Sequence, residues 1–257
     1  MQDFYFFGDT HRSIDMKKIK EVKTDINKTN KFFILGDWGG LWHNNFKKDY
    51  KFLIKWINLQ QEKNFELFII PGNHENYNVI NKLPETVIEN KDNYIKVKIL
   101  KIINPWTNKY KGTFYILKNG IHKINNKNVL TIRGAMSIDK KYRTENIDWW
   151  KQEILTEKEK ENIINEIKSY NGKFDYVLSH TCPVKIAKKL VNLYNYEKIN
   201  DPNALFLQDI YDKYLKNKFN LWLFGHFHKD YEIEYNKDKF ICLYNKLYVK
   251  NKDICII

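Results

Sequence analysis

Polar residues with catalytic or metal-binding potential follow a short apolar run in the first third of the chain. Residues 68–70 are apolar and lead into Gly72, Asn73 and His74. An apolar run that stops in a polar, glycine-containing loop is typical of a buried strand that ends at a sheet edge. In open α/β sheets, ligands and catalytic groups gather at such strand ends. Asn73 and His74 are therefore candidates for chemistry at the edge of a sheet.

The same pattern recurs at four other places in the chain. The polar residues that follow these apolar runs are Asp9 and His11 after residues 4–7, Asp37 after 32–35, His180 after 176–178, and His226 and His228 after 221–224. Asp and Asn oxygens with imidazole nitrogens, and without thiolates, suit Mn, Fe, Zn or Ni better than Ca or a thiolate-rich zinc site. Five strands that end in such residues predict a polynuclear metal site.

Each of these residues has a structural alternative when it is considered alone. A single His on a strand is more often a hydrogen-bonded structural residue than a ligand, and an Asp after Gly is often a turn or cap residue. However, five of the seven histidines fall at these strand ends, and only His43 and His122 lie elsewhere. The clustering favours a metal site for the set. His43 and His122 are interpreted as structural, with substrate contact left open for His43.

The five segments occur in a characteristic order. They are Gly-Asp-x-His at 8–11, Gly-Asp at 36–37, Gly-Asn-His-Glu at 72–75, Ser-His at 179–180 and Gly-His-x-His at 225–228. In this order they resemble the motifs of the calcineurin-like metallophosphoesterase superfamily. The resemblance implies an α/β fold, the four-layer αββα sandwich of metallo-dependent phosphatases, with two mixed β-sheets flanked by helices. It implies one domain over the whole chain, and a length of 257 residues agrees with one domain.

The resemblance also implies a role for each matching residue. A pair of metal ions needs a carboxylate that bridges them, and in the family pattern this is Asp37. The other ligands would be Asp9, His11 and His228 for one ion and Asn73, His180 and His226 for the other. His74 would protonate the leaving oxygen while a bridging hydroxide attacks phosphorus. The expected cofactors are two divalent or trivalent transition-metal ions, with Mn²⁺ favoured and Fe, Zn or Ni as alternatives.

The second motif departs from the family pattern. Many members continue Gly-Asp-x-x-Asp-Arg, whereas residues 36–41 read Gly-Asp-Trp-Gly-Gly-Leu. The missing Arg argues against the protein Ser/Thr phosphatase subclass. Because the arginine fork matches phosphate oxygens, Arg12 beside His11 and Arg143 in a predicted loop are candidate substrate-binding residues. A salt bridge is the alternative for both.

The predicted reaction is hydrolysis of a phosphate monoester or diester of a small or nucleotide-like molecule. A nuclease or nucleic-acid phosphodiesterase is a second hypothesis, motivated by a net charge of +13 and by aromatic residues in predicted loops. Scattered lysines favour a biased composition over a nucleic-acid patch. A non-catalytic scaffold of the same fold is a third hypothesis. It predicts missing ligands or a replaced His74, and neither is seen.

The composition indicates a globular protein. A hydrophobic share of 43% with 16% aromatic residues favours a packed core over disorder. No signal-like N-terminus and no apolar run near the roughly 18 residues of a membrane span are found, so a cytoplasmic protein without a membrane partner is expected. Three cysteines without zinc-finger spacing argue against a disulfide framework. The oligomeric state is left open.

The apolar patterns also predict the elements that position the site. Alternating strands and helices up to residue 70 predict a largely parallel sheet covered by helices, with helices at 15–27 and 46–60. Short runs within residues 94–134, separated by Asn/Gly turns, predict meandering strands that form a second sheet on the first. An irregular loop is expected at 137–152. Later helices are expected from Thr156, which has capping-box spacing with Glu159, to about 170, after Pro183, and from Asp201 to about 217.

Overall fold

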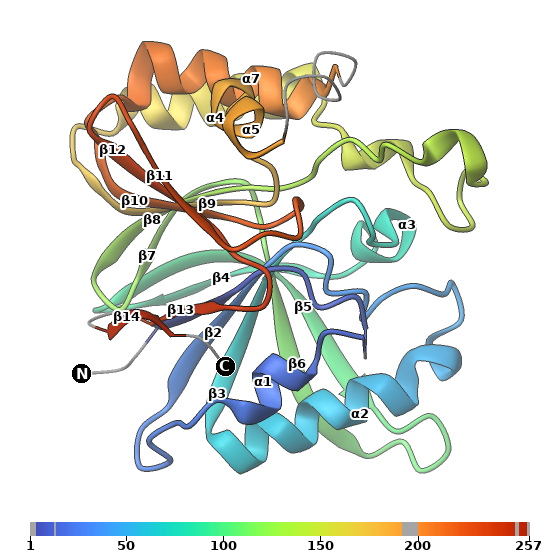
Figure 1. Cartoon of the computed structure of the whole chain (residues 1–257). Helices are drawn as coiled ribbons and strands as arrows, with labels where there is room; N and C mark the ends of the chain where they lie inside the picture. Colours follow the sequence, from blue (N-terminus) through green and yellow to red (C-terminus); the bar gives the residue numbers. More distant parts are fainter. Residues whose placement is uncertain (1–3, 13, 192–199, 250–251, 256–257) are drawn as a thin grey trace.

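The backbone forms two β-sheets that are joined at one corner. The structure is a computed structural model that describes residues 4–12, 14–191, 200–249 and 252–255. Its strands follow one hydrogen-bonded path, which turns where β5 (Asn93–Ile103) meets β7 (Gly120–Ile124) through the pair Tyr94 and Lys123. One sheet lies on each side of this turn (Figure 1).

The first sheet is parallel in its middle and antiparallel at its edges. In spatial order its strands are β14 (Lys252–Cys255), β13 (Leu247–Val249), β1 (Phe4–Phe7), β2 (Asn30–Leu35), β3 (Phe65–Ile70), β6 (Tyr110–Leu117), β5 and β4 (Glu85–Asn90). The run from β1 through β2 and β3 to β6 is parallel, while β13 and β5 pair antiparallel with their neighbours.

The second sheet has the same mixed character. In spatial order its strands are β7, β8 (Lys127–Ile132), β9 (Phe174–Ser179), β10 (Phe219–Phe224), β12 (Asp238–Cys242) and β11 (Tyr231–Tyr235). The run from β8 through β9 and β10 to β12 is parallel, and the two edge strands are antiparallel.

Helices cover the outer face of each sheet (Figure 1). The helices are α1 (Lys17–Glu21) and α2 (Phe46–Lys63) on the first sheet, α4 (Glu157–Ser169), α5 (Val184–Leu190) and α7 (Pro202–Ile210) on the second, and the short α3 (Tyr77–Ile80) after β3. A π-helical turn at Tyr211–Leu215 extends α7, and 3₁₀ turns lie at Lys140–Tyr142 and Lys151–Glu153. None of the described helices has both the length and the hydrophobicity that a membrane span requires.

Side-chain alternation explains why the sheets are buried on both faces. Phe4 and Phe6 of β1 belong to an apolar cluster between the sheets, whereas Tyr5 and Phe7 belong to a cluster under α1 and α2. Consecutive side chains of a strand point to opposite faces, so one aromatic strand contributes to both clusters. A third cluster lies between the second sheet and α4, α5 and α7. Three apolar interfaces between four layers confirm the predicted αββα sandwich.

The allocation of strands to sheets differs from the expectation. β6 pairs in parallel with β3, so β5 and β6 extend the first sheet, and only β7 and β8 of the expected meander begin the second. The reason is that Phe114 and Ile116 of β6 pack into the cluster under α2. β4 and α3 were not predicted from the sequence. β4 is an edge strand with largely exposed side chains, and it carries little apolar periodicity.

The helix expected at 15–27 is also shorter than predicted. It ends at Glu21, and Asp25 then accepts a hydrogen bond from the Asn27 backbone at 3.0 Å, which forms a turn. The capping box of Thr156 and Glu159 is present at the start of α4, as predicted. Cys182 and Cys242 are free and buried.

Removing a ring from the cluster between the sheets should destabilise the fold. Phe33 is fully buried, with its ring stacked on Phe6 at 4.9 Å and on Phe68 at 5.4 Å between centroids. We expect Phe33→Ala to lower the free energy of unfolding by about 3–5 kcal/mol, because it leaves a cavity between two rigid sheets. Denaturant unfolding followed by circular dichroism measures this loss. Ile26→Ala, at a side chain that is 63% exposed, is the control and should change it by less than about 0.5 kcal/mol. A loss under about 1 kcal/mol for Phe33→Ala would contradict a closed core here.

Candidate metal centre

Five strands deliver the predicted ligands to one edge of the sandwich. The side chains are Asp9 and His11 after β1, Asp37 after β2, Asn73 after β3, His180 after β9, and His226 and His228 after β10. β1, β2 and β3 are parallel neighbours, as are β9 and β10, so their carboxyl ends share an edge. Hydrogen bonds between the loops join the two sheets there. His180 Nδ1 contacts the Leu35 carbonyl at 2.7 Å, and the His226 N–H donates to Asp9 Oδ1 at 2.9 Å.

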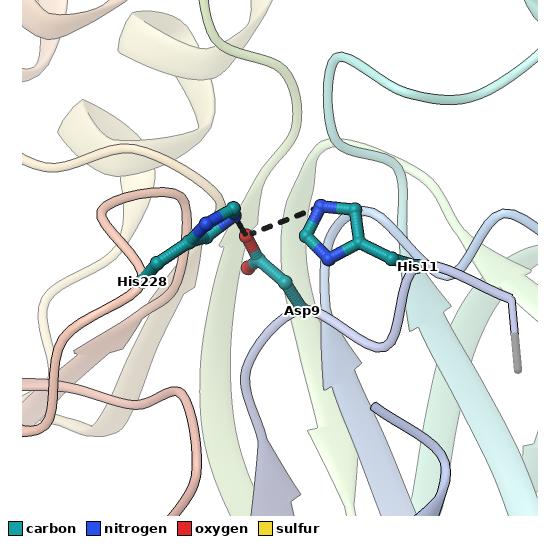
Figure 2. Close-up of side chains that lie close together, drawn as sticks. All are labelled: Asp9, His11 and His228. Atoms are coloured by element: carbon teal, nitrogen blue, oxygen red, sulfur yellow. Dashed lines mark ion pairs between the residues drawn. The ribbon is translucent and has the colours of Figure 1, made fainter. Parts of the chain in front are cut away.

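Asp9 lies between two imidazole rings (Figure 2). Its Oδ2 is 3.0 Å from Nε2 of His228 and 4.0 Å from Nε2 of His11. The carboxylate is fully buried, and this Oδ2 accepts no well-aligned hydrogen bond from the described residues. A buried carboxylate oxygen is unfavourable unless a donor or a cation satisfies it. One oxygen faced by two imidazole nitrogens fits a metal ion bound by all three residues.

Asp37 occupies the centre of the constellation. Its Oδ2 lies 3.5 Å from His11 Nε2 and 3.9 Å from His74 Nε2. Its Oδ1 lies 3.3 Å from His180 Nε2 and accepts a hydrogen bond from the His74 backbone N–H at 2.8 Å. The two oxygens of one buried carboxylate therefore face different imidazole groups. This arrangement fits the bridging position that the motif predicts.

The third part of the centre is formed by an amide and two further imidazoles. Nε2 of the buried His180 is 2.9 Å from Asn73 Oδ1. The Asn73 amide nitrogen donates in the other direction, to Ser137 Oγ at 3.1 Å. The His226 ring lies 4.9 Å from the His180 ring between centroids. The structure thus brings all seven predicted ligands together around one centre.

Glycines let the loops approach the two carboxylates closely. A Cβ atom at Gly225 would lie 2.3 Å from Asp9 Oδ1, and one at Gly72 would lie 2.2 Å from Asp37 Oδ1. Real side chains do not fit at such distances. Gly72 and Gly225 therefore allow the backbone N–H groups of His74 and His226 to reach Asp37 and Asp9.

The carboxylates shift the pKa values of the imidazoles around them. Burial lowers the pKa of His11 and His180, but the charges of Asp37 and Asp9 outweigh burial and raise the values to about 9 and about 10. Burial and the His180 charge lower the pKa of His226 to about 3, so His226 is neutral and able to bind a metal at neutral pH. Without metal, protons on His11 and His180 balance the carboxylate charge. Cations at this centre would take their place.

His74 lies on the wall of a pocket at this centre. The pocket has a volume of about 470 Å³, and its wall also includes Asn73, His226 and the apolar Phe227. Trp42 stacks over the His74 ring at 6.2 Å between centroids. Burial lowers the pKa of His74, and Asp37 partly opposes this effect.

The two candidate arginines are placed differently. Arg143 binds Asp139 Oδ2 at 2.6 Å, Asp139 lines the pocket, and the Arg143 charge contributes to the lowered pKa of His74. Arg12 instead binds the buried Asp49 at 2.7 Å and the Gly39 carbonyl at 3.3 Å. Both arginines therefore make the salt bridge that was their alternative, and a role in substrate binding stays a prediction for both.

Asp49 organises the loop after β2. Its Oδ1 also contacts Nδ1 of His43 at 2.7 Å, and its Oδ2 accepts hydrogen bonds from the backbone of Trp42 and His43 at 3.2 and 2.9 Å. No sequence pattern marks Asp49, which stands in the first turn of α2. His122 is buried and contacts Thr131 Oγ1 at 2.8 Å, as its structural interpretation predicted.

Two other acidic residues support the ligands and were not assigned from the sequence. Asp15 contacts Nδ1 of His11 at 3.0 Å, which leaves Nε2 of His11 facing the centre. Its position four residues after His11 is a signal that could have been used. Glu75, in the third motif, accepts hydrogen bonds from Gly72 and Gly39 at 2.6 and 3.1 Å and so ties the loops after β2 and β3 together.

Comparison with known proteins identifies the family. The sequence profile of the calcineurin-like phosphoesterase family matches residues 3–230, and the chain therefore belongs to this family. Two solved structures are similar. One is the phosphopantetheinyl hydrolase PptH of Mycobacterium tuberculosis, with 8% identity, a TM-score of 0.46, and coverage of 95% of this chain and 89% of that one. The other is a candidate 5′-nucleotidase of Staphylococcus aureus in complex with α-ketoglutarate, with 12% identity, a TM-score of 0.46, and coverage of 96% and 50%. The search of curated proteins found no match.

Metal binding should release protons. In the metal-free protein His11 and His180 hold their protons below pKa values of about 9 and about 10, and both must lose them to bind a cation through nitrogen. We expect release of about two protons per chain at pH 7.5 and an affinity that rises with pH toward 9. Calorimetry in buffers of different ionisation enthalpy counts these protons. His11→Gln should lower the count by about one, and His43→Gln should leave it unchanged. Tight binding without proton release would contradict the assigned ligands.

Proposed function

We propose that the chain is a dinuclear metal-dependent phosphoesterase that hydrolyses phosphate monoesters or diesters, with His74 as the general acid. The observation that carries this proposal is the convergence of two carboxylates, one amide and four imidazoles, from five strand ends, on one centre beside a pocket that Asp37, Asn73, His226 and His228 line. Membership of the calcineurin-like phosphoesterase family supports it. The whole chain would act as one catalytic domain.

The donor set divides into two groups that share Asp37. One cation would be held by Asp9, His11, His228 and Asp37, and the other by Asn73, His180, His226 and Asp37. Oxygen and nitrogen donors without thiolates suit Mn²⁺, which we favour, as well as Fe, Zn or Ni. Bound cations would supply a water of lowered pKa and neutralise the phosphoryl oxygens. Asn73 contributes a neutral oxygen, so it adds no negative charge that would repel the substrate.

His74 is the candidate for the residue that would protonate the leaving oxygen. Its Nε2 is 3.9 Å from Asp37 Oδ2, and its ring borders the pocket. Trp42 stacks against the His74 ring at 6.2 Å between centroids. The lowered pKa favours proton release from His74 to a leaving alkoxide, and the negative charge of a bound phosphate would help to load the proton beforehand.

The pocket suits a small organic phosphoester. A volume of about 470 Å³ lies in the range of small-molecule sites, and Ile138, Val191 and Phe227 give it an apolar side. Arg143 beside Asp139 is the candidate for contact with substrate oxygens. Activity on long DNA or RNA that falls steeply with salt, while activity on a small diester does not, would instead favour the nuclease hypothesis.

Loss of the shared carboxylate should weaken metal retention. Asp37→Asn removes the negative charge that both proposed cations share, so we expect a metal content below that of the wild type after desalting. Elemental analysis of Mn²⁺-loaded protein measures this content. Asp139→Asn, at the pocket rim and outside the ligand set, is the matched control and should keep the full content. An Asp37→Asn protein with wild-type metal content would contradict the bridging role.

Loss of His74 should affect chemistry and spare metal binding. For His74→Ala we expect the wild-type metal content and a fall in kcat of about 10²–10⁴-fold on an alkyl phosphoester. The fall should be smaller on a p-nitrophenyl ester, because that leaving group needs no proton. His43→Ala serves as the control. Equal losses on both substrates would contradict the general-acid role, and metal-replete wild-type protein inactive on every phosphoester would favour the scaffold hypothesis.

A further inference from the structure

The side-chain amide of Asn73 must be oriented before it can bind a cation. An amide presents an oxygen acceptor on one side and an NH₂ donor on the other, and only the oxygen can act as a metal ligand. A ligand role for Asn73 rests on the proposed function. The two orientations have nearly the same shape, so packing alone does not choose between them.

A buried chain of hydrogen bonds leads away from this amide. Asn73 Nδ2 donates to Ser137 Oγ at 3.1 Å, and Ser137 Oγ donates to Glu153 Oε2 at 2.6 Å. The backbone N–H of Ser137 donates to Glu153 Oε1 at 2.8 Å. All three side chains are almost completely buried, and Glu153 is not exposed at all. Water does not compete for these bonds.

The chemistry of these three side chains gives each hydrogen bond in the series a fixed direction. Burial raises the pKa of Glu153, and its hydrogen bonds from Ser137 lower it; in its ionised form Glu153 has no proton and can only accept. The single hydroxyl proton of Ser137 is therefore committed to Glu153, and Ser137 Oγ can only accept from Asn73. As a consequence the NH₂ group of Asn73 faces Ser137, and its Oδ1 faces Nε2 of His180 at 2.9 Å.

We propose that Glu153 is a positioning residue for the metal centre: acting through Ser137, it fixes the Asn73 amide with its oxygen toward the cations. In the described structure the Glu153 carboxylate makes no hydrogen bond to a proposed ligand, and Glu153 does not line the pocket beside the centre. Its backbone carbonyl accepts a hydrogen bond from Asn203 Nδ2 at 2.9 Å, and Asn203 Oδ1 accepts one from the Leu155 backbone at 3.0 Å. These bonds hold the backbone of Glu153 to Asn203 in the first turn of α7, and so help to position its carboxylate.

The surroundings of Glu153 distinguish this role from a structural ion pair. Within the described part of the chain, no Lys or Arg forms a salt bridge with Glu153, and its carboxylate accepts hydrogen bonds from Ser137. The Trp149 side chain and the charge of Lys140 also lower its pKa. A buried carboxylate without a cation partner is unfavourable for stability. Glu159, a few residues further on, shows the contrasting case, since it is paired with Arg133 at 2.7 Å.

Replacing Glu153 by Gln tests the direction of the hydrogen bonds from Asn73 through Ser137 to Glu153. The Ser137 N–H would keep the Gln oxygen in place, so the new NH₂ group would face Ser137 Oγ as a donor. The Ser137 hydroxyl would then need another acceptor, which favours a flipped Asn73 with its NH₂ toward the cations. In a Mn²⁺ titration of the purified protein by calorimetry, we expect one of the two dissociation constants of Glu153→Gln to weaken by about 10–100-fold. The other constant should stay at the wild-type value.

Two further variants complete the test. Ser137→Ala removes the acceptor for the Asn73 amide and should raise the same Mn²⁺ dissociation constant. It tests the hydrogen-bond series independently if Glu153→Gln fails to fold. The double variant should be no weaker than either single variant, because the residues act in series. Glu159→Gln also removes a carboxylate in this region, but it does not bond to Ser137, so both constants should match the wild type.

The outcomes separate this inference from the proposed function. Two tight Mn²⁺ sites in the wild type that are unchanged in Glu153→Gln and Ser137→Ala would overturn the positioning role alone. Equal weakening of both sites together with a lowered Tm would also overturn it, because it would indicate general loosening. A wild-type protein that binds no metal would overturn the proposed function, and the positioning role with it.

Discussion

The burial of two carboxylates where the sheets meet is the constraint on which the rest of the structure depends. Asp9 and Asp37 are withdrawn from water, and an uncompensated buried charge would unfold a marginally stable domain. Each carboxylate is compensated in part by a backbone N–H group from another loop. The loop after β10 gives a backbone N–H to Asp9, and the loop after β3 gives one to Asp37. The contacts that stabilise the carboxylates therefore also join strands that are far apart in the sequence.

The backbone around these carboxylates is held in conformations that side chains rarely adopt. His11, Asp37, His226 and His228 all have positive φ, between 40° and 68°. Such a conformation costs about 1–2 kcal/mol for a residue other than glycine. It persists because other contacts determine it, such as the His11 N–H donating to the Asp37 carbonyl at 2.8 Å. Asparagine tolerates this conformation better than other residues, and of the six described residues with positive φ that are neither Gly nor Asn, four are proposed ligands.

Sequence patterns predicted the parts of this protein that are encoded locally. Each strand end and its polar residue lie within a few positions of each other, so apolar runs and glycines were sufficient to find them. The allocation of β5 and β6 to the first sheet was not predictable in this way, because both faces of these strands are partly apolar and pairing is decided by distant partners. The same is true of Ser137, which bonds to Asn73 from 64 positions away. A residue that acts through space leaves no local pattern.

The contacts behind the atoms that face the centre set three of the proposed ligands apart from the proposed proton donor. His11, His180 and Asn73 each have a hydrogen-bond partner on the atom that points away from the centre: Asp15, the Leu35 carbonyl and Ser137 respectively. These bonds fix which atom faces a cation, as second partners of metal ligands do. His74 differs, because in the described structure it is held by its backbone N–H and by stacking on Trp42, while its ring has no hydrogen bond of this kind. The rings of His226 and His228 also lack such a bond in the described structure, so this contact distinguishes His11 and His180, but not every imidazole of the proposed set, from the proposed proton donor, whose ring nitrogens must be free to gain and lose a proton.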